Sequence, residues 1–182
     1  LGSGNPGATN VLRIAGEKAA ALTLAGDSLK GFLPLVFFAI LRRFFPAGVD
    51  DLTIILVGLG AFFGHLYPIF FELKGGKGVA TAFGVLLGWN PVVALLSVGI
   101  WGAVFWNTKI SSLSALTAAG FAVIATIFYA PLDYLRPAVF VMVGMLIYRH
   151  RSNIERLIKG EEIPFGQSKP LSDDDDDDND ED

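Results

Sequence analysis

Residues 78–108 have the sequence GVATAFGVLLGWNPVVALLSVGIWGAVFWNT, an uncharged run bounded by Lys77 and Lys109. Crossing a hydrocarbon core of roughly 30 Å takes about 20 apolar residues in a helix. This run of 31 residues is therefore long enough to enter a bilayer. Pro91 has no backbone N–H and disfavours a helical conformation at Asn90, so we expect the run to break there into two helices. The first of them, at residues 79–87, is too short to span a membrane alone.

Apolar stretches recur along the chain, at residues 31–45, 52–71, 110–132 and 137–148, of which the first contains Arg42 and Arg43 and the second contains His65. The first extends back through residues 19–26 if the membrane tolerates Asp27 and Lys30, which lie three positions apart and can pair. The last has only 12 residues and is too short for a perpendicular span. We therefore predict an all-α fold, a polytopic membrane helix bundle with about five to six membrane helices present.

The composition supports a membrane protein and excludes several other classes. Of 182 residues, 52% are hydrophobic and 18% are charged, against about a quarter charged in soluble domains. No cysteine is present, which excludes disulfide scaffolds and thiolate chemistry. Half of the 18 acidic residues lie within residues 173–182, so the rest of the chain is basic although the net charge is −4. We expect one membrane domain at residues 1–169 and a disordered acidic tail at residues 170–182.

The connectors between the apolar stretches differ in charge. Residues 46–51 contain two acids and no base, so the positive-inside rule predicts that they lie on the outer side. The connectors that we then assign to the cytoplasmic face are residues 2–13, 72–78 and 149–169. The last of these can share that face only if an even number of helices separates Gly78 from Arg149. The break expected at Pro91 gives four helices and meets that condition.

The first connector has the sequence GSGNPGATNVLR, at residues 2–13. Its three glycines and one proline within six positions disfavour a regular helix. They let backbone N–H groups point inward together, an arrangement that binds phosphate. Thr9 or Asn10 can then cap a following helix whose positive end adds to that field. The alternative is a membrane-surface turn with incidental polar residues. The candidate ligands are Ser3, Gly4, Asn5, Asn10 and Arg13.

The second motif has the sequence ELKGGKGVAT, at residues 72–81. Its glycines would let a bare backbone approach an anion while the two lysine ammonium groups neutralise it. The Walker pattern does not fit, because Val79 occupies the position of the hydroxyl residue. A flexible loop between two membrane helices is the alternative. The candidate ligands are Lys74, Gly75, Gly76, Lys77 and Gly78.

The third motif has the sequence RHRSNIER, at residues 149–156. His150, Asn153 and Arg156 are spaced three apart, so a helix would present an imidazole, an amide and a guanidinium group on one face. Such a face can hold a small phosphate ester. The alternative is a basic segment that meets anionic lipid headgroups, which we favour for Arg151 and Lys159.

Smaller features add few further candidates. Ser111, Ser112 and Ser114 follow Lys109 at the start of an apolar stretch, where they are either helix N-caps or substrate ligands. A metal site would have to rest on the two histidines, His65 and His150, and a few carboxylates. We therefore predict no metal and no cofactor, and no nucleic-acid partner.

The three motifs, in this order and separated by apolar stretches, resemble the bacterial acyl phosphate:glycerol-3-phosphate acyltransferase family. The likeness covers the chain from Gly2 to about Glu162. It implies a membrane enzyme that transfers a fatty acyl group from acyl phosphate to the first hydroxyl of glycerol 3-phosphate, giving lysophosphatidate for phospholipid synthesis. It also implies the bacterial inner membrane, a functional link to an enzyme that produces acyl phosphate, and a first membrane helix that is missing here before Gly2.

Carried over to this sequence, the resemblance implies a catalytic set of Ser3, Arg13, His150 and Asn153. It implies that residues 75–78 bind acyl phosphate and that His150 and Asn153 help to hold glycerol 3-phosphate, with Ser112 and Arg156 as further substrate ligands. No Ser-His-Asp constellation is apparent. The implied proton acceptor is a phosphate oxygen of the donor, and His150 as general base is the alternative.

A transporter or channel module for a small anionic substrate is the alternative function. In that case Asp27 and Lys30 would line a pathway at the membrane midplane. A membrane scaffold is a third possibility, which leaves the polar residues of the motifs without a role. Three anion-binding motifs on one face favour the enzyme, since a transporter more often carries charged residues at matching depths in two repeats.

Overall fold

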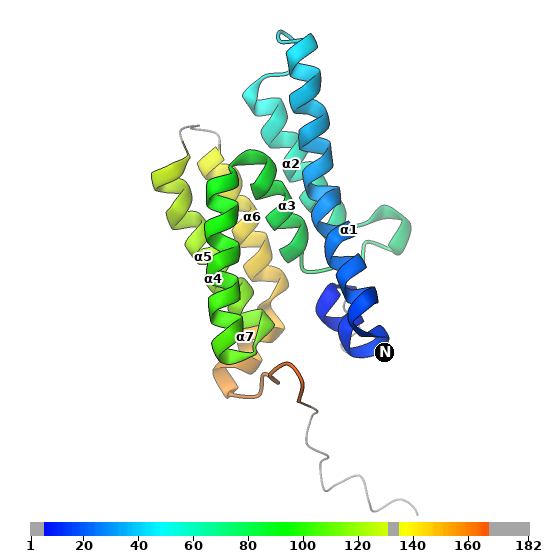
Figure 1. Ribbon diagram of the computed structural model, residues 1–182, viewed down its shortest axis with the longest axis vertical. Helices are drawn as coiled ribbons and strands as arrows, with labels where there is room; N and C mark the ends of the chain where they lie inside the picture. Colours follow the sequence, from blue (N-terminus) through cyan, green and yellow to red (C-terminus); the bar gives the residue numbers. More distant parts are fainter. Residues whose placement is uncertain (1–5, 131–134, 168–182) are drawn as a thin grey trace, which may run out of the picture.

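A computed structural model describes residues 6–130 and 135–167, and within these ranges every regular element is a helix (Figure 1). The elements are α1 (Ala8–Phe44), α2 (Asp51–Leu66), the 3₁₀ helix η1 (Ile69–Phe71), α3 (Val79–Trp89), α4 (Pro91–Thr108), α5 (Ser111–Tyr129), α6 (Leu135–Arg149) and α7 (Arg151–Lys159). The predicted all-α fold is confirmed. The predicted acidic tail, at residues 170–182, lies outside the described residues.

Four segments are long and apolar enough to cross a membrane, namely α1, α2 together with η1, α4 and α5. α3 and α6 are also apolar but have only 11 and 15 residues. The polytopic membrane bundle is thus confirmed. In the described part of the chain, the five to six expected helices consist of four of spanning length and two shorter ones.

The predicted break at Pro91 is present. α3 ends at Trp89, α4 begins at Pro91, and Asn90 lies between them. The Asn90 side chain accepts a hydrogen bond from the Val93 amide (3.1 Å), which caps α4, and donates one to the Tyr129 carbonyl (2.8 Å) at the end of α5. Four helices, α3 to α6, therefore separate the connector before α3 from α7, as the sequence predicted.

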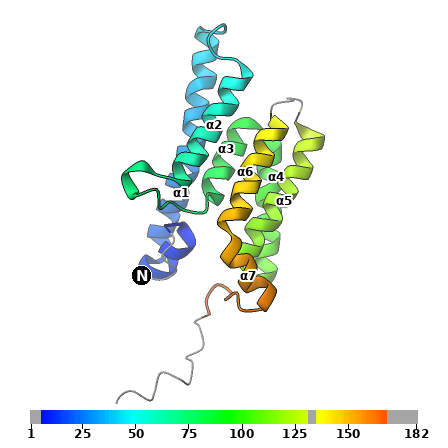
Figure 2. The ribbon, with the colours of Figure 1, turned by 180° about the vertical axis from the view of Figure 1, so that it is seen from behind.

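This alternation gives the bundle two distinct ends (Figures 1 and 2). We call the end that holds the start of α1, the start of α3 and all of α7 the cavity end. The opposite end, which holds the turn from α1 to α2 and the junction at Asn90, is called the turn end. The described residues of all three sequence motifs belong to the cavity end, whereas the acidic connector at residues 46–51 belongs to the turn end.

α1 is bent at Gly16, whose φ of 80° and ψ of −178° suit glycine and few other residues. The bend brings the first part of α1 against the start of α5, where Thr9 and Ser111 share a hydrogen bond of 3.2 Å. The helix begins after Gly7, so Thr9 and Asn10 lie inside its first turn. The prediction that one of these two residues caps the helix is therefore wrong.

α3 is the central helix, with α1 on one side and α4 on the other (Figures 1 and 2). Glycines allow α1 and α3 to approach closely: a Cβ on Gly31 would lie 2.5 Å from the Thr81 carbonyl oxygen, and one on Gly84 would overlap the Ser28 carbonyl. Small residues give membrane helices this close contact. Because α3 is short and packed on both sides, its N-terminus is held at a fixed place within the bundle.

Candidate active site

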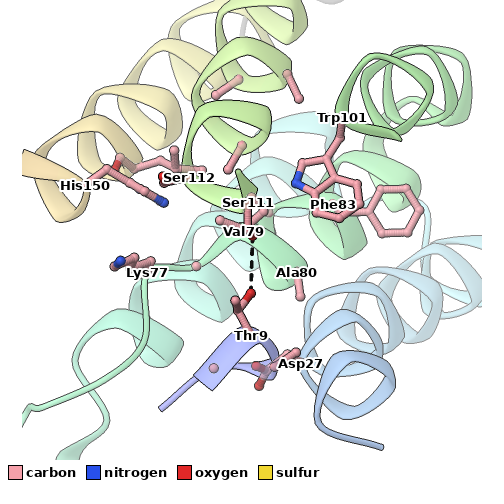
Figure 3. A pocket seen from close by; sticks show the side chains of 18 of the residues that line it. Thr9, Asp27, Lys77, Val79, Ala80, Phe83, Trp101, Ser111, Ser112 and His150 are labelled. Atoms are coloured by element: carbon pink, nitrogen blue, oxygen red, sulfur yellow. Dashed lines mark hydrogen bonds between the residues drawn. The ribbon is translucent and has the colours of Figure 1, made fainter. Parts of the chain in front are cut away.

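A cavity of about 790 Å³ lies at the cavity end, among the N-terminal ends of α1, α3, α5 and α7. In Figure 3, Lys77, Ser112 and His150 lie on one side of it and Phe83 and Trp101 on the other. Four basic and two acidic side chains line the cavity, namely Arg13, Lys77, Lys109, Arg156, Asp27 and Glu162. The charged lining is therefore positive on balance.

Apolar side chains make up most of the remaining cavity lining, beside uncharged polar ones such as Asn10 and Ser97. α5 contributes a face of small residues, and α3, α4 and α6 contribute larger ones. The small residues are Ala115, Ala118, Ala119 and Ala122, and the larger ones include Phe83, Leu86, Trp101, Met142 and Leu146. The cavity thus combines a charged region with a wall suited to an apolar chain.

Four helix N-termini meet at this cavity, and each contributes lining residues: Ala8 of α1, Val79 of α3, Ser111 of α5 and His150 before α7. None of the four is capped by a side-chain hydrogen bond within the described residues. The first N–H groups of a helix have no partner inside the helix, and the helix dipole is positive there. The four helix ends therefore favour an anion in the cavity.

The serines at the start of α5 do not serve as caps. The N-cap position is held by Ile110, so the alternative that Ser111, Ser112 or Ser114 caps this helix is wrong. Ser114 instead donates to the Ile110 carbonyl (2.8 Å), and Ser112 points to the cavity. Of the two sequence-based interpretations, only the ligand role remains for Ser112.

The glycine-rich loop brings one of its two lysines to the cavity. Lys77 lines the cavity, and its ammonium group donates a hydrogen bond to Oδ1 of Asn153. Burial lowers the pKa of Lys77; the Glu162 carboxylate opposes this shift, and nearby arginines add to it. Lys74 is 80% exposed, pairs with Glu72 at 2.6 Å and is absent from the described lining. The structure therefore separates two lysines that the sequence analysis grouped as one site.

The three glycines of the loop also differ in position. Gly78 lines the cavity and stands at the N-cap of α3 with a φ of 84°, in the left-handed region that favours glycine. Gly75 and Gly76 lie behind it, outside the described lining. A Cβ on Gly75 would overlap the His65 carbonyl, so this glycine is required for close contact between the loop and the end of α2.

His150 lies at the junction of α6 and α7 and is only 2% exposed. Its Nδ1 is 2.8 Å from the Leu146 carbonyl oxygen, which can only accept, so Nδ1 carries the proton and Nε2 is left as an acceptor. Burial lowers the pKa of His150 to about 4. The ring is therefore neutral at physiological pH and able to accept a hydrogen bond from a hydroxyl group.

Glu162 is a cavity residue that the sequence analysis missed. Its carboxylate accepts hydrogen bonds from Ser112 (2.6 Å), Asn153 (2.6 Å) and Arg156 (2.7 Å). Burial acts to raise its pKa, but these three hydrogen bonds outweigh burial, and the pKa of Glu162 lies below its ordinary value. The ionised carboxylate holds three predicted ligands in one cluster. No local pattern in the sequence distinguishes it from its neighbour Glu161.

Asp27 and His65 bring two further ionisable groups to the cavity wall. Asp27 pairs with Lys30 at 2.6 Å, which confirms the pairing expected from their spacing. Oδ1 of Asp27 also lies 3.5 Å from Nδ1 of His65, so α1 and α2 approach each other beside the glycine-rich loop. The sequence analysis gave no partner for His65.

The structure brings residues of all three motifs together. Predicted ligands that line the cavity are Asn10, Arg13, Lys77, Gly78, Ser112, His150, Asn153 and Arg156. Those outside its described lining are Lys74, Gly75 and Gly76, and three more, Ser3, Gly4 and Asn5, lie outside the described residues. Among the described residues, no group of three or more histidine or carboxylate side chains is placed to hold a metal ion.

Sequence comparison identifies the family. The model of the family described as glycerol-3-phosphate acyltransferase matches residues 1–160. The chain belongs to this family. It is 46% identical over 168 residues to the glycerol-3-phosphate acyltransferase of Paraburkholderia phytofirmans, covering 92% of this chain and 78% of that protein. It is also 46% identical to that of Neisseria meningitidis serogroup C, covering 92% of this chain and 83% of the relative.

Solved structures agree with this assignment. The chain resembles crystal structures of PlsY, described as an integral membrane glycerol 3-phosphate acyltransferase, at 41% sequence identity. The TM-score is 0.83 for the glycerol 3-phosphate form, covering 91% of this chain and 80% of PlsY. It is 0.82 for the lysophosphatidic acid form, covering 90% and 81%. The protein is therefore an integral membrane glycerol-3-phosphate acyltransferase of phospholipid biosynthesis, which confirms the resemblance drawn from the three motifs.

Proposed function

We propose that this protein transfers a fatty acyl group from an acyl phosphate to the 1-hydroxyl of glycerol 3-phosphate, giving lysophosphatidate and inorganic phosphate. One observation carries the proposal: a single cavity joins four helix N-termini and four basic side chains to an apolar wall. Two phosphate-bearing substrates need the first part, and a fatty acyl chain needs the second.

The acyl phosphate is assigned to the start of α3. Lys77 supplies a cation there, and Val79 and Ala80 line the same wall with the first N–H groups of the helix. Arg13 adds a second cation from α1. In this arrangement the acyl chain extends along the alanine face of α5. The remaining residues of the first motif, Ser3, Gly4, Asn5 and Asn10, complete the phosphate site in our proposal.

Glycerol 3-phosphate is assigned to the start of α7 and the adjoining turn of α5. Arg156 is suited to the phosphate, and Nε2 of His150 is suited to accept a hydrogen bond from a glycerol hydroxyl. Ser112 and Asn153 lie next to both groups, held by the Glu162 carboxylate. Because Lys77 donates to Asn153, the two substrate sites share one hydrogen-bond network.

The chemistry needs charge neutralisation more than acid catalysis. An acyl phosphate is a mixed anhydride, so its phosphate already leaves readily once its charge is stabilised. The glycerol oxygen attacks the acyl carbonyl carbon, and the bond from that carbon to the phosphate oxygen breaks. The hydroxyl proton passes to a phosphate oxygen of the donor. His150, with a pKa of about 4, is a weak base at neutral pH and instead orients the hydroxyl group.

We assign the protein to the bacterial inner membrane with the cavity end on the cytoplasmic side. Support comes from the acidic connector at residues 46–51, which belongs to the turn end and predicts an outer location. A cytoplasmic cavity would receive glycerol 3-phosphate from solution. It would also require an enzyme of acyl phosphate production as a functional partner.

The test uses purified, detergent-solubilised protein supplied with palmitoyl phosphate and radiolabelled glycerol 3-phosphate. We expect radiolabelled lysophosphatidate as the product and no turnover when palmitoyl-CoA replaces palmitoyl phosphate. Product formation from palmitoyl-CoA alone would contradict the proposed donor. No product from either donor, with protein that elutes as a single folded species, would contradict the proposed function.

A further inference from the structure

Arg149 is the last residue of α6 and lies outside the described lining of the cavity. Its guanidinium group nevertheless contacts the glycine-rich loop. Nε donates a hydrogen bond to the Gly76 carbonyl (3.2 Å) and Nη2 donates one to the Gly75 carbonyl (2.5 Å). The same group lies over the ring of Tyr67, 5.7 Å from its centre. One planar side chain therefore holds two consecutive carbonyl groups.

The direction of these carbonyls fixes the direction of the next amides. The described peptide bonds are trans, and in a trans peptide the oxygen and the amide hydrogen point to opposite sides. Since the carbonyls of Gly75 and Gly76 point to Arg149, the N–H groups of Gly76 and Lys77 point away from it. Within the described ranges no hydrogen bond is assigned to these two N–H groups, so neither has a partner among these residues.

The opposite side of the loop faces residues of the cavity wall. A Cβ on Gly76 would overlap Nε2 of His65 and lie 2.8 Å from the Pro6 carbonyl oxygen. His65 and Pro6 both line the cavity, and Oδ1 of Asp27 lies 3.5 Å from Nδ1 of His65. The loop is thus held between Arg149 on one side and the first motif with His65 on the other.

We propose that Arg149 is a positioning residue, which turns the Gly76 and Lys77 amides toward the phosphate of the acyl donor. The inference rests on the proposed function, because it takes the donor phosphate as the anion at this loop. A positive charge alone does not perform this task, since an ammonium group lacks the planar fork that engages two carbonyls at once. The effect of Arg149 is therefore greatest for one substrate and depends on the guanidinium shape.

The test compares Arg149→Ala and Arg149→Lys with the control Arg151→Ala. Arg151 is an exposed neighbour whose hydrogen bond within the described residues goes to the Tyr148 carbonyl (3.3 Å), and it lies over the Tyr148 ring. For Arg149→Ala we expect kcat/KM for palmitoyl phosphate to fall about tenfold or more, as the loss of charged hydrogen bonds implies. We expect a smaller rise in the KM for glycerol 3-phosphate, because the loop reaches that site through the hydrogen bond from Lys77 to Asn153.

Two further measurements separate positioning from charge and from folding. Arg149→Lys is expected to retain most of the defect, and added guanidinium ion is expected to restore part of the activity of Arg149→Ala. Full activity in Arg149→Lys, or an equal loss for both substrates, would overturn the positioning role. If the wild-type protein turns over palmitoyl phosphate and Arg149→Ala does so with unchanged kcat/KM, the positioning role of Arg149 is overturned, while the proposed function stands. A wild-type protein that does not use palmitoyl phosphate would overturn the proposed function, and this inference with it.

Discussion

The two ends of the bundle differ in whether side chains cap the helix N-termini. At the turn end, the Asp50 carboxylate caps α2 by accepting from the Thr53 amide (2.7 Å), and Asn90 caps α4 in the same way (3.1 Å). At the cavity end, α1, α3, α5 and α7 begin without a side-chain cap in the described chain. Side chains of the protein thus cap α2 and α4 at the turn end, whereas the four helices that begin at the cavity end have no side-chain cap among the described residues.

This difference separates a structural region from a binding region. A side-chain cap typically stabilises a helix by about 1 kcal/mol, so four uncapped helices give up stability that the fold could have had. What the cavity end gains is a set of helix N–H groups without side-chain caps and a potential that is positive on balance. At the turn end, α2 and α4 keep the stability that their side-chain caps provide. The contrast predicts that substitutions at the cavity end alter kinetics, while those at the turn end alter stability.

Gly76→Ala should have the largest effect. The added Cβ would overlap Nε2 of His65 and crowd the Pro6 carbonyl, so the loop must shift. A displacement of about 1 Å at a substrate site can lower turnover by roughly 100-fold, and we expect a loss of at least that order. The measurement is kcat/KM for palmitoyl phosphate in purified protein.

The matched control for this substitution is Gly64→Ala. Gly64 precedes His65 in α2, but a Cβ placed on it meets no atom within 4 Å. We expect its activity to remain near that of the wild type. A similar loss in both variants would mean that the region tolerates no side chain, which would contradict a specific role for the loop.

Glu162→Gln should have the next largest effect. Glutamine has one acceptor oxygen, because an NH2 group replaces the other. It therefore cannot accept from Arg156 on one side and from Ser112 and Asn153 on the other, so these ligands lose their common anchor. Loss of one charged hydrogen bond implies a rise of about tenfold in the KM for glycerol 3-phosphate. The exposed neighbour Glu161, changed to Gln, is the control. Equal effects of the two variants would contradict the anchoring role.

His150→Gln tests the protonation state of the cavity end. Burial lowers the pKa of His150 to about 4, below its ordinary value, so the ring is neutral throughout the range from about pH 5.5 to 8. We expect a several-fold lower kcat/KM for glycerol 3-phosphate but a pH profile of unchanged shape. Titration of the substrate phosphate near pH 6 affects both proteins alike. A limb near pH 6.5 that disappears in the variant would instead identify His150 as a titrating base.

The fold could be predicted because its determinants are local. The length of the uncharged run at residues 78–108 and the missing N–H of Pro91 are sufficient to predict two helices there. The number of helices between Gly78 and Arg149 is then even, which predicts that the second and third motifs lie at the same end of the bundle. Helix starts were harder to predict. Thr9 is a good capping residue, yet α1 begins at Ala8 because the chain can already turn at Gly7. A preference for a residue type does not decide between neighbouring positions.

The site could be predicted only in part, because several of its contacts join distant residues. Glu162 meets Ser112 across 50 positions and Arg149 meets Gly75 across 74, and no spacing rule connects such pairs. Lys74 was instead predicted as a ligand but lies outside the described lining of the cavity. It stands three positions from Lys77, but the turn of the loop exposes it beside Glu72 and leaves only Lys77 in the cavity. The motifs indicated the chemistry, whereas the fold selected which of their side chains take part.

Asn90→Ala should have the smallest kinetic effect and completes the comparison from the turn end. The substitution removes the cap of α4 and the hydrogen bond to the Tyr129 carbonyl, and leaves the cavity lining intact. Loss of the cap is expected to cost about 1 kcal/mol, or roughly 2–4 °C in Tm for a chain of this size, with kcat and both KM values unchanged. Asn107→Ala is the control, because Asn107 lies within α4 and its side chain bonds, in the described part of the chain, to the Ala103 carbonyl of the same helix (2.7 Å), so its loss should not destabilise the helix. A kinetic defect in Asn90→Ala at unchanged Tm would mean that the turn end communicates with the cavity, and the division between a structural and a binding end would fail.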